Sequence, residues 1–177
     1  MCTFNHFSAW VIATGESSNN GGKIVGGEPA PLGSVPYQVS VYHGGGHACG
    51  GAIVGPDTIV TAAHCCFSTP INFRIHAGLN SMLSPESGAQ LNLAVKKIIR
   101  HPGYAPGSYD NDICIMKLKK KLVLSPEKRT AAISLPPEGY TAAGQATVTG
   151  WGFEYEGGRP SSVLMTVNVT IFNDDEW

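Results

Sequence analysis

Short stretches of alternating apolar and polar residues recur along most of the chain. They are separated by turn-forming residues such as Gly55, Pro56 and Asp57. A period of two residues places successive side chains on opposite faces of an extended strand. The pattern predicts strands over residues 37–42, 48–54, 58–61, 73–77, 91–95 and 113–118. Short strands at this spacing indicate a small antiparallel barrel or sandwich.

Two connections between these strands have a clear composition. Residues 43–47 read His-Gly-Gly-Gly-His, which predicts a loop that joins the first two strands as a hairpin. Residues 62–65 read Ala-Ala-His-Cys and are expected to leave the strand at 58–61 as a tight turn or a single helical turn.

A second unit is expected to begin near residue 131. Residues 145–152 predict a strand that ends at Trp151 between two glycines, and residues 163–172 predict one more strand. Two or three strands cannot close a barrel. The chain is therefore predicted to comprise a leader or pro-segment over 1–23, a first β-barrel over 24–130, and a connector with the first strands of an incomplete second barrel over 131–177.

Composition and charge exclude several classes of protein. Hydrophobic residues make up 42% of the chain and charged residues 14%, which is typical of a folded globular protein. The net charge of −1 argues against a nucleic-acid binder, which would carry a basic surplus. The lysines within 117–121 fit a solvated strand end. No stretch approaches the ~20 apolar residues of a membrane span, so we expect no membrane partner.

The N-terminal region predicts an extracellular protein. Residues 7–13 are apolar, at the short limit of a signal-peptide core, although no basic residues precede them. A polar, glycine-rich stretch over 17–22 leads to Lys23, next to Ile24. This junction is either a site for tryptic cleavage or an ordinary domain boundary. Cys49 and Cys65 flank a loop, which favours an oxidising compartment.

His64 and Asp112 are the candidate catalytic residues. Histidine can act as a base near neutral pH, and an aspartate can orient it. Asp110 is a neighbouring alternative. The apolar strand that starts at Ile113 favours Asp112, because it anchors that residue at a strand edge. His43 and His47 with Cys49 could suggest zinc, but a run of glycines gives no fixed geometry, so we expect no metal.

Several motifs occur in a fixed order and together resemble the chymotrypsin/trypsin family of secreted serine proteases over residues 24–177. The motifs are Ile-Val-Gly-Gly at 24–27, Pro-Tyr-Gln-Val-Ser at 36–40, Cys-Gly-Gly at 49–51, Thr-Ala-Ala-His-Cys at 61–65, Asn-Asp-Ile at 111–113 and Val-Thr-Gly-Trp-Gly at 148–152.

The resemblance implies a fold, an activity and roles for particular residues. The fold is an all-β, chymotrypsin-like double antiparallel β-barrel, and the activity is that of a serine endopeptidase on proteins or peptides without a cofactor. His64 would be the base and Asp112 its orienting group. Cys49 and Cys65 would form a disulfide, worth about 3 kcal/mol in the chain-entropy model. Cleavage between Lys23 and Ile24 by a trypsin-like protease would activate the enzyme.

The sequence departs from the family at the nucleophile. Neither Gly-Asp-Ser-Gly-Gly nor any other Gly-x-Ser-x-Gly occurs in residues 1–177. The serine, the oxyanion hole around it and the pocket that sets specificity are therefore absent. We expect a C-terminally truncated member that is inactive as it stands. A non-catalytic homologue that acts as a binding or regulatory module is the alternative, and a partner chain that supplies the serine is a third reading.

Smaller departures give further expectations. In the family's calcium-binding loop, two acidic positions fall on Leu79 and Ala89 and only Glu86 remains, so calcium binding is not expected. Cys66 and Cys114 follow His64 and Asp112 closely, and either a second disulfide or two buried thiols is expected. Residues 168–170 read Asn-Val-Thr, a glycosylation sequon at Asn168 within a predicted strand.

Overall fold

Six antiparallel strands close into a barrel, as the alternating pattern predicts. The computed structural model describes residues 27–152 and 159–171. Around the barrel the strands follow the order β2-β3-β4-β7-β6-β5, and β5 pairs back to β2. Their bounds are β2 (Gln38–His43), β3 (Gly46–Gly55), β4 (Thr58–Thr61), β5 (Phe73–Ala77), β6 (Gln90–Arg100) and β7 (Cys114–Leu118).

The barrel closes because each strand turns one set of side chains inward. On β2, Val39 and Val41 are fully buried in the barrel core, while Tyr42 lies on the other face. The inward side chains are large and apolar, and burying each contributes about 1.5–3 kcal/mol. The fully buried members of this core include Val39, Val41, Ile53, Ile59, Phe73, Ile75, Met116 and Leu118.

β3 and β6 are longer than predicted. The loop expected over 43–47 is a two-residue turn, in which Gly44 and Gly45 have φ of 60° and 91°. His43 pairs with Gly46 and Tyr42 with His47, so the pairing of β2 with β3 continues up to this turn. β6 continues to Arg100 through two exposed lysines, which interrupt the alternation without ending the strand.

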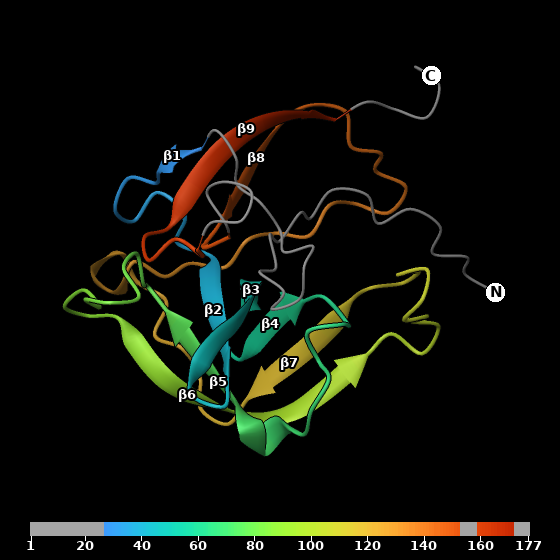
Figure 1. The fold of residues 1–177 in the computed structure, drawn as a ribbon, viewed down its shortest axis with the longest axis horizontal. Helices are drawn as coiled ribbons and strands as arrows, with labels where there is room; N and C mark the ends of the chain where they lie inside the picture. Colours follow the sequence, from blue (N-terminus) through green and yellow to red (C-terminus); the bar gives the residue numbers. More distant parts are fainter. Residues whose placement is uncertain (1–26, 153–158, 172–177) are drawn as a thin grey trace.

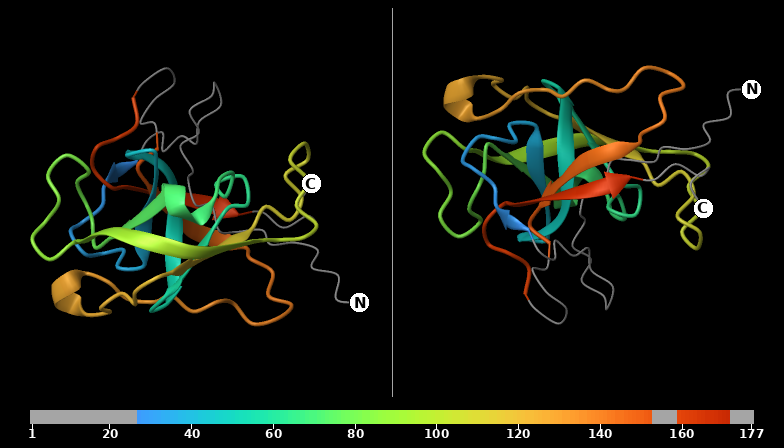
Figure 2. Two further views of the ribbon diagram at one scale, coloured as in Figure 1. Left: turned by 90° about the horizontal axis from the view of Figure 1, so that it is seen from below. Right: turned by 90° about the horizontal axis from the view of Figure 1, so that it is seen from above.

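A three-stranded antiparallel sheet lies beside the barrel and confirms the predicted fold class (Figure 1). It consists of β1 (Glu28–Pro29), β9 (Met165–Ile171) and β8 (Gly144–Gly150), in that order. Figure 2 shows the same arrangement from below and from above. Because β1 pairs with β9, an early segment of the chain belongs to this second sheet. The predicted domain boundaries at 24, 131 and 177 stay predictions.

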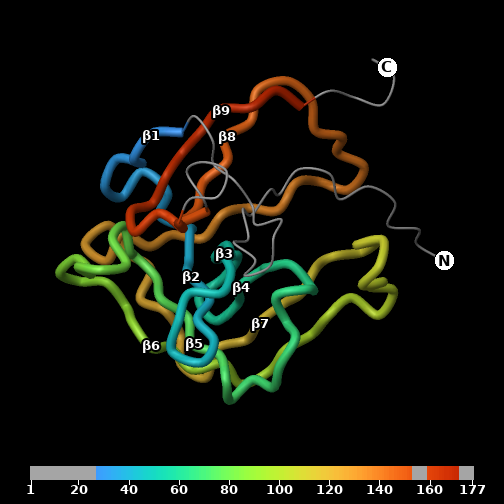
Figure 3. Tube along the Cα trace, in the orientation of Figure 1, coloured from blue at the N-terminus to red at the C-terminus, as the bar shows by residue number. Residues whose placement is uncertain are grey.

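Trp151 fastens the sheet to the barrel. Its side chain is fully buried among Ala30, Leu79 and Leu164, and its indole Nε1 donates a hydrogen bond of 3.0 Å to the backbone oxygen of Asn80. Figure 3 traces the connector over 119–143, which leads from β7 to β8.

The helical content of the described residues is small. It comprises two 3₁₀ turns, η1 (Pro70–Asn72) before β5 and η2 (Pro126–Lys128) in the connector. In the part of the chain that the structure describes, no helix is long and apolar enough to cross a membrane.

Candidate active site

His64 lies on a tight turn that leaves the end of β4. β4 ends at Thr61, whose hydroxyl donates a buried hydrogen bond of 2.7 Å to the backbone oxygen of Gly50 on β3. The turn is closed by backbone bonds from Cys65 N to Ala62 O at 3.2 Å and from Cys66 N to Ala63 O at 3.0 Å. The small side chains at 62 and 63 allow this turn, which presents the imidazole at the barrel's edge.

Asp112 reaches the same edge from β7. β4 and β7 are antiparallel neighbours, and Thr61 pairs with Cys114 at the end of their ladder. Asp112 lies two residues before that pair, and His64 three residues after it. The loop before Asp112 bends through Asn111, whose φ is 55°. Adjacent strand ends therefore bring together two residues that are 48 positions apart in the sequence.

The carboxylate of Asp112 binds His64 through both oxygens. Oδ2 lies 2.6 Å from the imidazole Nδ1, and Oδ1 accepts a hydrogen bond of 2.8 Å from the backbone N–H of His64. Both side chains are mostly buried, with 16% and 19% of their surface exposed. A carboxylate only accepts, so Nδ1 carries the proton and the lone pair of the neutral ring is on Nε2.

Tyr109 and Asp110 lie on the loop before Asp112. The ring of Tyr109 meets the ring of His64 edge to face, with centroids 5.9 Å apart. Tyr109 is 52% exposed and has a φ of 58°, so its position depends on a backbone conformation that the strand pattern does not reveal. Asp110 does not replace Asp112, because its Oδ2 accepts a bond from Ser108.

Four buried cysteines form two disulfides around the pair. Cys49 is joined to Cys65 and Cys66 to Cys114, each with Sγ atoms 2.09 Å apart. Of the two expectations for Cys66 and Cys114, the structure has the disulfide. The ligand atoms of Cys49, His64 and Cys65 lie within 4.8 Å of one another, but bridged sulfurs are not thiolates, so this group does not suit a metal ion.

The remaining predicted positions are Asn168 and residues near the N-terminus. Lys23, Ile24 and Cys2 lie outside the described residues. Asn168 is exposed on β9, and its Oδ1 accepts a hydrogen bond of 2.9 Å from the Thr147 hydroxyl.

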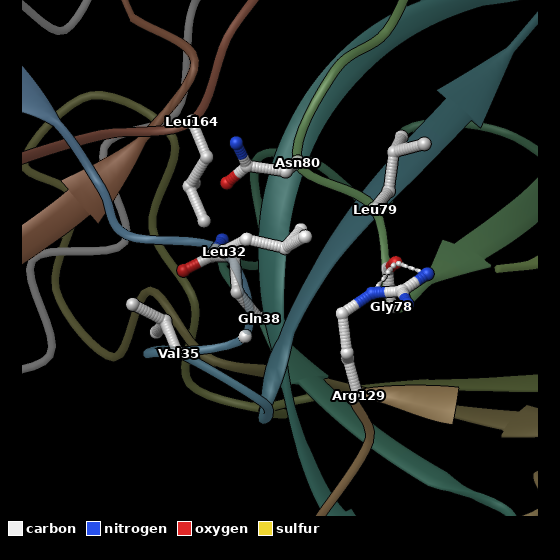
Figure 4. A pocket seen from close by; sticks show the side chains of 9 residues that line it. Leu32, Val35, Gln38, Gly78, Leu79, Asn80, Arg129 and Leu164 are labelled. Atoms are coloured by element: carbon white, nitrogen blue, oxygen red, sulfur yellow. Dashed lines mark hydrogen bonds between the residues drawn. The ribbon is translucent and has the colours of Figure 1, made fainter. Parts of the chain in front are cut away.

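In the loop between β5 and β6, where the resemblance places calcium, side chains of the protein bind the backbone groups of the loop. Both oxygens of the Glu86 carboxylate accept backbone N–H bonds of 2.9 Å, from Asn80 and Ser81. Arg129 donates to the backbone oxygens of Gly78 and Ser87, and Figure 4 shows its contact with Gly78. The apolar side chain of Leu79 is buried. These residues do not fit a calcium ion, which requires six to eight oxygen ligands.

Glu86 should therefore stabilise the loop with or without calcium. Glu86→Gln should lower the free energy of unfolding by about 1–3 kcal/mol, because hydrogen bonds to a charged acceptor are replaced by weaker ones. Urea unfolding in calcium and in EDTA should give the same midpoint for the unmodified chain. A rise of that midpoint with calcium would contradict this reading of the loop.

His47 lies on the face of β3 toward the second sheet, with its ring between polar and aromatic groups. Its Nδ1 lies 2.7 Å from the Ser40 hydroxyl, and its ring meets Trp151 edge to face at 5.8 Å. The buried Nε2 atom has no hydrogen-bond partner among the described residues. Burial disfavours the charged ring and lowers the pKa of His47 to about 4.

His47 should make the fold sensitive to mild acid. Its pKa in the unfolded chain is near 6.5, so below that pH the unfolded state takes up a proton that the folded state refuses. Stability should therefore fall as the pH drops from about 6.5 to about 4, by up to about 3 kcal/mol. Burial also lowers the pKa of His76, which acts in the same direction.

Urea unfolding at a series of pH values checks this, with His47→Gln as the comparison. The variant should lose most of the slope between about pH 6.5 and pH 4. Asp57 adds little to this slope, because its pKa is about 3.8 in the unfolded chain and is lowered to about 2 in the folded chain by the hydrogen bond from Lys117, so its proton uptake lies mostly below pH 4. An unchanged slope in His47→Gln would assign the acid sensitivity to other groups.

Comparison with known proteins gives consistent matches. A family model described as Trypsin matches residues 24–177. Trypsin-1 of Astacus astacus is 37% identical over 161 residues, which is 86% of this chain and 67% of that protein. The venom peptide isomerase heavy chain of Agelenopsis aperta is 36% identical over 84% of this chain and 63% of its own length. Human granzyme M is 32% identical, with coverages of 94% and 65%. The chain thus spans about two thirds of the length of these curated relatives.

Proposed function

The chain belongs to the trypsin family of serine proteases, and we propose that it supplies the acid–base half of a serine endopeptidase. The observation that carries this proposal is the contact of 2.6 Å between His64 Nδ1 and Asp112 Oδ2. Family membership alone does not require that the two residues meet. The two residues come from separate loops, and both oxygens of the Asp112 carboxylate bind His64. This arrangement favours a catalytic role for the pair.

In the proposed reaction, His64 acts first as a base and then as an acid. A serine hydroxyl next to Nε2 gives its proton to the ring while its oxygen attacks the peptide carbonyl. Asp112 stabilises the resulting imidazolium through the proton on Nδ1. His64 then gives the proton to the departing amine, which leaves an acyl-enzyme that water hydrolyses in the same way. No cofactor is needed.

We propose that residues 1–177 by themselves do not perform this reaction. They contain no Gly-x-Ser-x-Gly segment, so the nucleophile and the oxyanion hole would come from sequence outside them. A single oxyanion donor can be worth ~10²–10³ in rate. The coverage of about two thirds of the relatives' length fits this proposal.

The proposed setting is extracellular. Two disulfides in the described residues are typical of proteins that fold under oxidising conditions. Activation would follow cleavage between Lys23 and Ile24 by a trypsin-like protease. Proteins or peptides would be the substrates, and the exposed Asn168 would be available for glycosylation.

The first test is the transcript beyond the codon for Trp177. It should encode a Gly-Asp-Ser-Gly-Gly segment, and a stop codon directly after Trp177 would instead favour a binding or regulatory module. The longer protein, cleaved after Lys23, should then hydrolyse a peptide library, whereas His64→Ala and residues 1–177 alone should not. Hydrolysis that survives His64→Ala would contradict the proposal.

A further inference from the structure

The ladder between β4 and β7 ends just short of His64 and Asp112. Its last pair is Thr61 with Cys114. Beyond this pair the two segments no longer pair with each other as strands, although the backbone N–H of His101 donates a bond of 2.9 Å to the Ile113 oxygen on the β7 side. The His64–Asp112 hydrogen bonds cross the gap. Their net energy is modest because the same groups bond to water in the unfolded chain, whereas ordering two loops costs conformational entropy.

We propose that the Cys66–Cys114 disulfide positions Asp112 against His64, an inference that rests on the proposed catalytic role of this pair. Cys66 lies two residues after His64, and Cys114 lies two residues after Asp112. Their Cα atoms are 6.7 Å apart, and both residues are at least 98% buried, with exposures of 2% and 1%. The bridge therefore joins the two loops covalently, close in sequence to the hydrogen bond between His64 and Asp112.

The two disulfides have different geometric consequences. β4 lies between β3 and β7 in the barrel. Cys65 bonds to Cys49 on β3, while its neighbour Cys66 bonds to the first residue of β7. The first bridge holds the turn that bears His64 but does not reach the segment of Asp112. The second bridge connects both arms of the pair, so it is the one that controls their separation.

Nuclear magnetic resonance of the proton on His64 Nδ1 tests the proposal in the full chain of residues 1–177. A proton held in a short hydrogen bond exchanges slowly with water and gives a resolved downfield signal. Removing both cysteines with Cys66→Ala and Cys114→Ala creates no new unpaired cysteine. In that variant the proton should exchange at least about tenfold faster, because the loops separate more often.

Two further variants separate positioning from general stability. Leu118→Ala removes a fully buried side chain at the other end of β7, so it should lower the thermal midpoint but keep the Nδ1 signal. Cys66→Ala with Cys114→Val restores apolar volume without the bridge, and it should show the same fast exchange as the double alanine variant.

The exchange rate of the Nδ1 proton separates the positioning role from the proposed function. A folded variant without the bridge that keeps the original exchange rate would overturn the positioning role and leave the proposed function intact. Unfolding of both bridge-free variants would also overturn it, since the disulfide would then serve the whole barrel. If the unmodified chain lacks the Nδ1 signal, the pair itself is not formed, and the proposed function fails before this inference does.

Discussion

In the proposed longer protein that carries the serine, Asp112→Asn should reduce kcat by about 10⁴-fold. The asparagine fits the same space, but its side-chain NH₂ group can donate to Nδ1 of His64. The ring would then carry its proton on Nε2 and could not accept one from the serine. At about 1.4 kcal/mol for each factor of ten, the loss corresponds to about 5.5 kcal/mol of transition-state stabilisation.

Steady-state kinetics on a peptide substrate measure this effect. KM should change little, because the lost interaction strengthens only as the ring becomes charged. Asp110→Asn is the matched control, since Asp110 is close in sequence but binds Ser108 instead of His64. Asp110→Asn should leave kcat near its original value. Equal losses in the two variants would show that the 2.6 Å contact has no special role.

Phe73→Ala should lower the free energy of unfolding by about 3–5 kcal/mol. Phe73 is the first residue of β5, is fully buried and packs in the barrel core. Its removal sacrifices a large apolar contact and leaves a cavity that the surrounding strands cannot fill. Loss of this size is a large part of the stability of a typical domain, which is about 5–15 kcal/mol.

Phe67→Ala is the comparison for Phe73→Ala. Phe67 contacts Phe73 edge to face at a centroid distance of 5.6 Å but is 58% exposed. Its truncation should cost only about 1 kcal/mol, the typical value of an aromatic pair at the surface. Urea unfolding at neutral pH measures both. Similar losses in the two variants would contradict the core that the structure assigns.

Most of the barrel could be predicted from the alternation, because each strand has one face in a dry core and one face outside. The errors have physical causes. The glycine run at 43–47 suggested a long loop, but two glycines at positive φ suffice for a tight hairpin turn. β1 has two residues and pairs with a strand from the other end of the chain, so no local pattern could reveal it.

The His64–Asp112 contact was predictable from motifs, whereas the surroundings of the pair were not. Tyr109 approaches the ring because the loop bends at positive φ, which the sequence does not encode in a recognisable way. The sequence does not decide between a Cys66–Cys114 disulfide and two free thiols, because the bond depends on how closely two loops approach. The ring contact of His47 with Trp151 could not be predicted either, because Trp151 directly follows β8 in the second sheet, far away in the sequence.

Covalent labelling with a fluorophosphonate probe tests most directly whether His64 and Asp112 activate a serine. The longer protein, cleaved after Lys23, should take up the probe at a serine within a Gly-x-Ser-x-Gly segment. Residues 1–177 alone should remain unlabelled, and His64→Ala in the longer protein should abolish labelling. Labelling that persists in His64→Ala, or a cleaved and folded longer protein that takes up no probe, would contradict the role assigned to this pair.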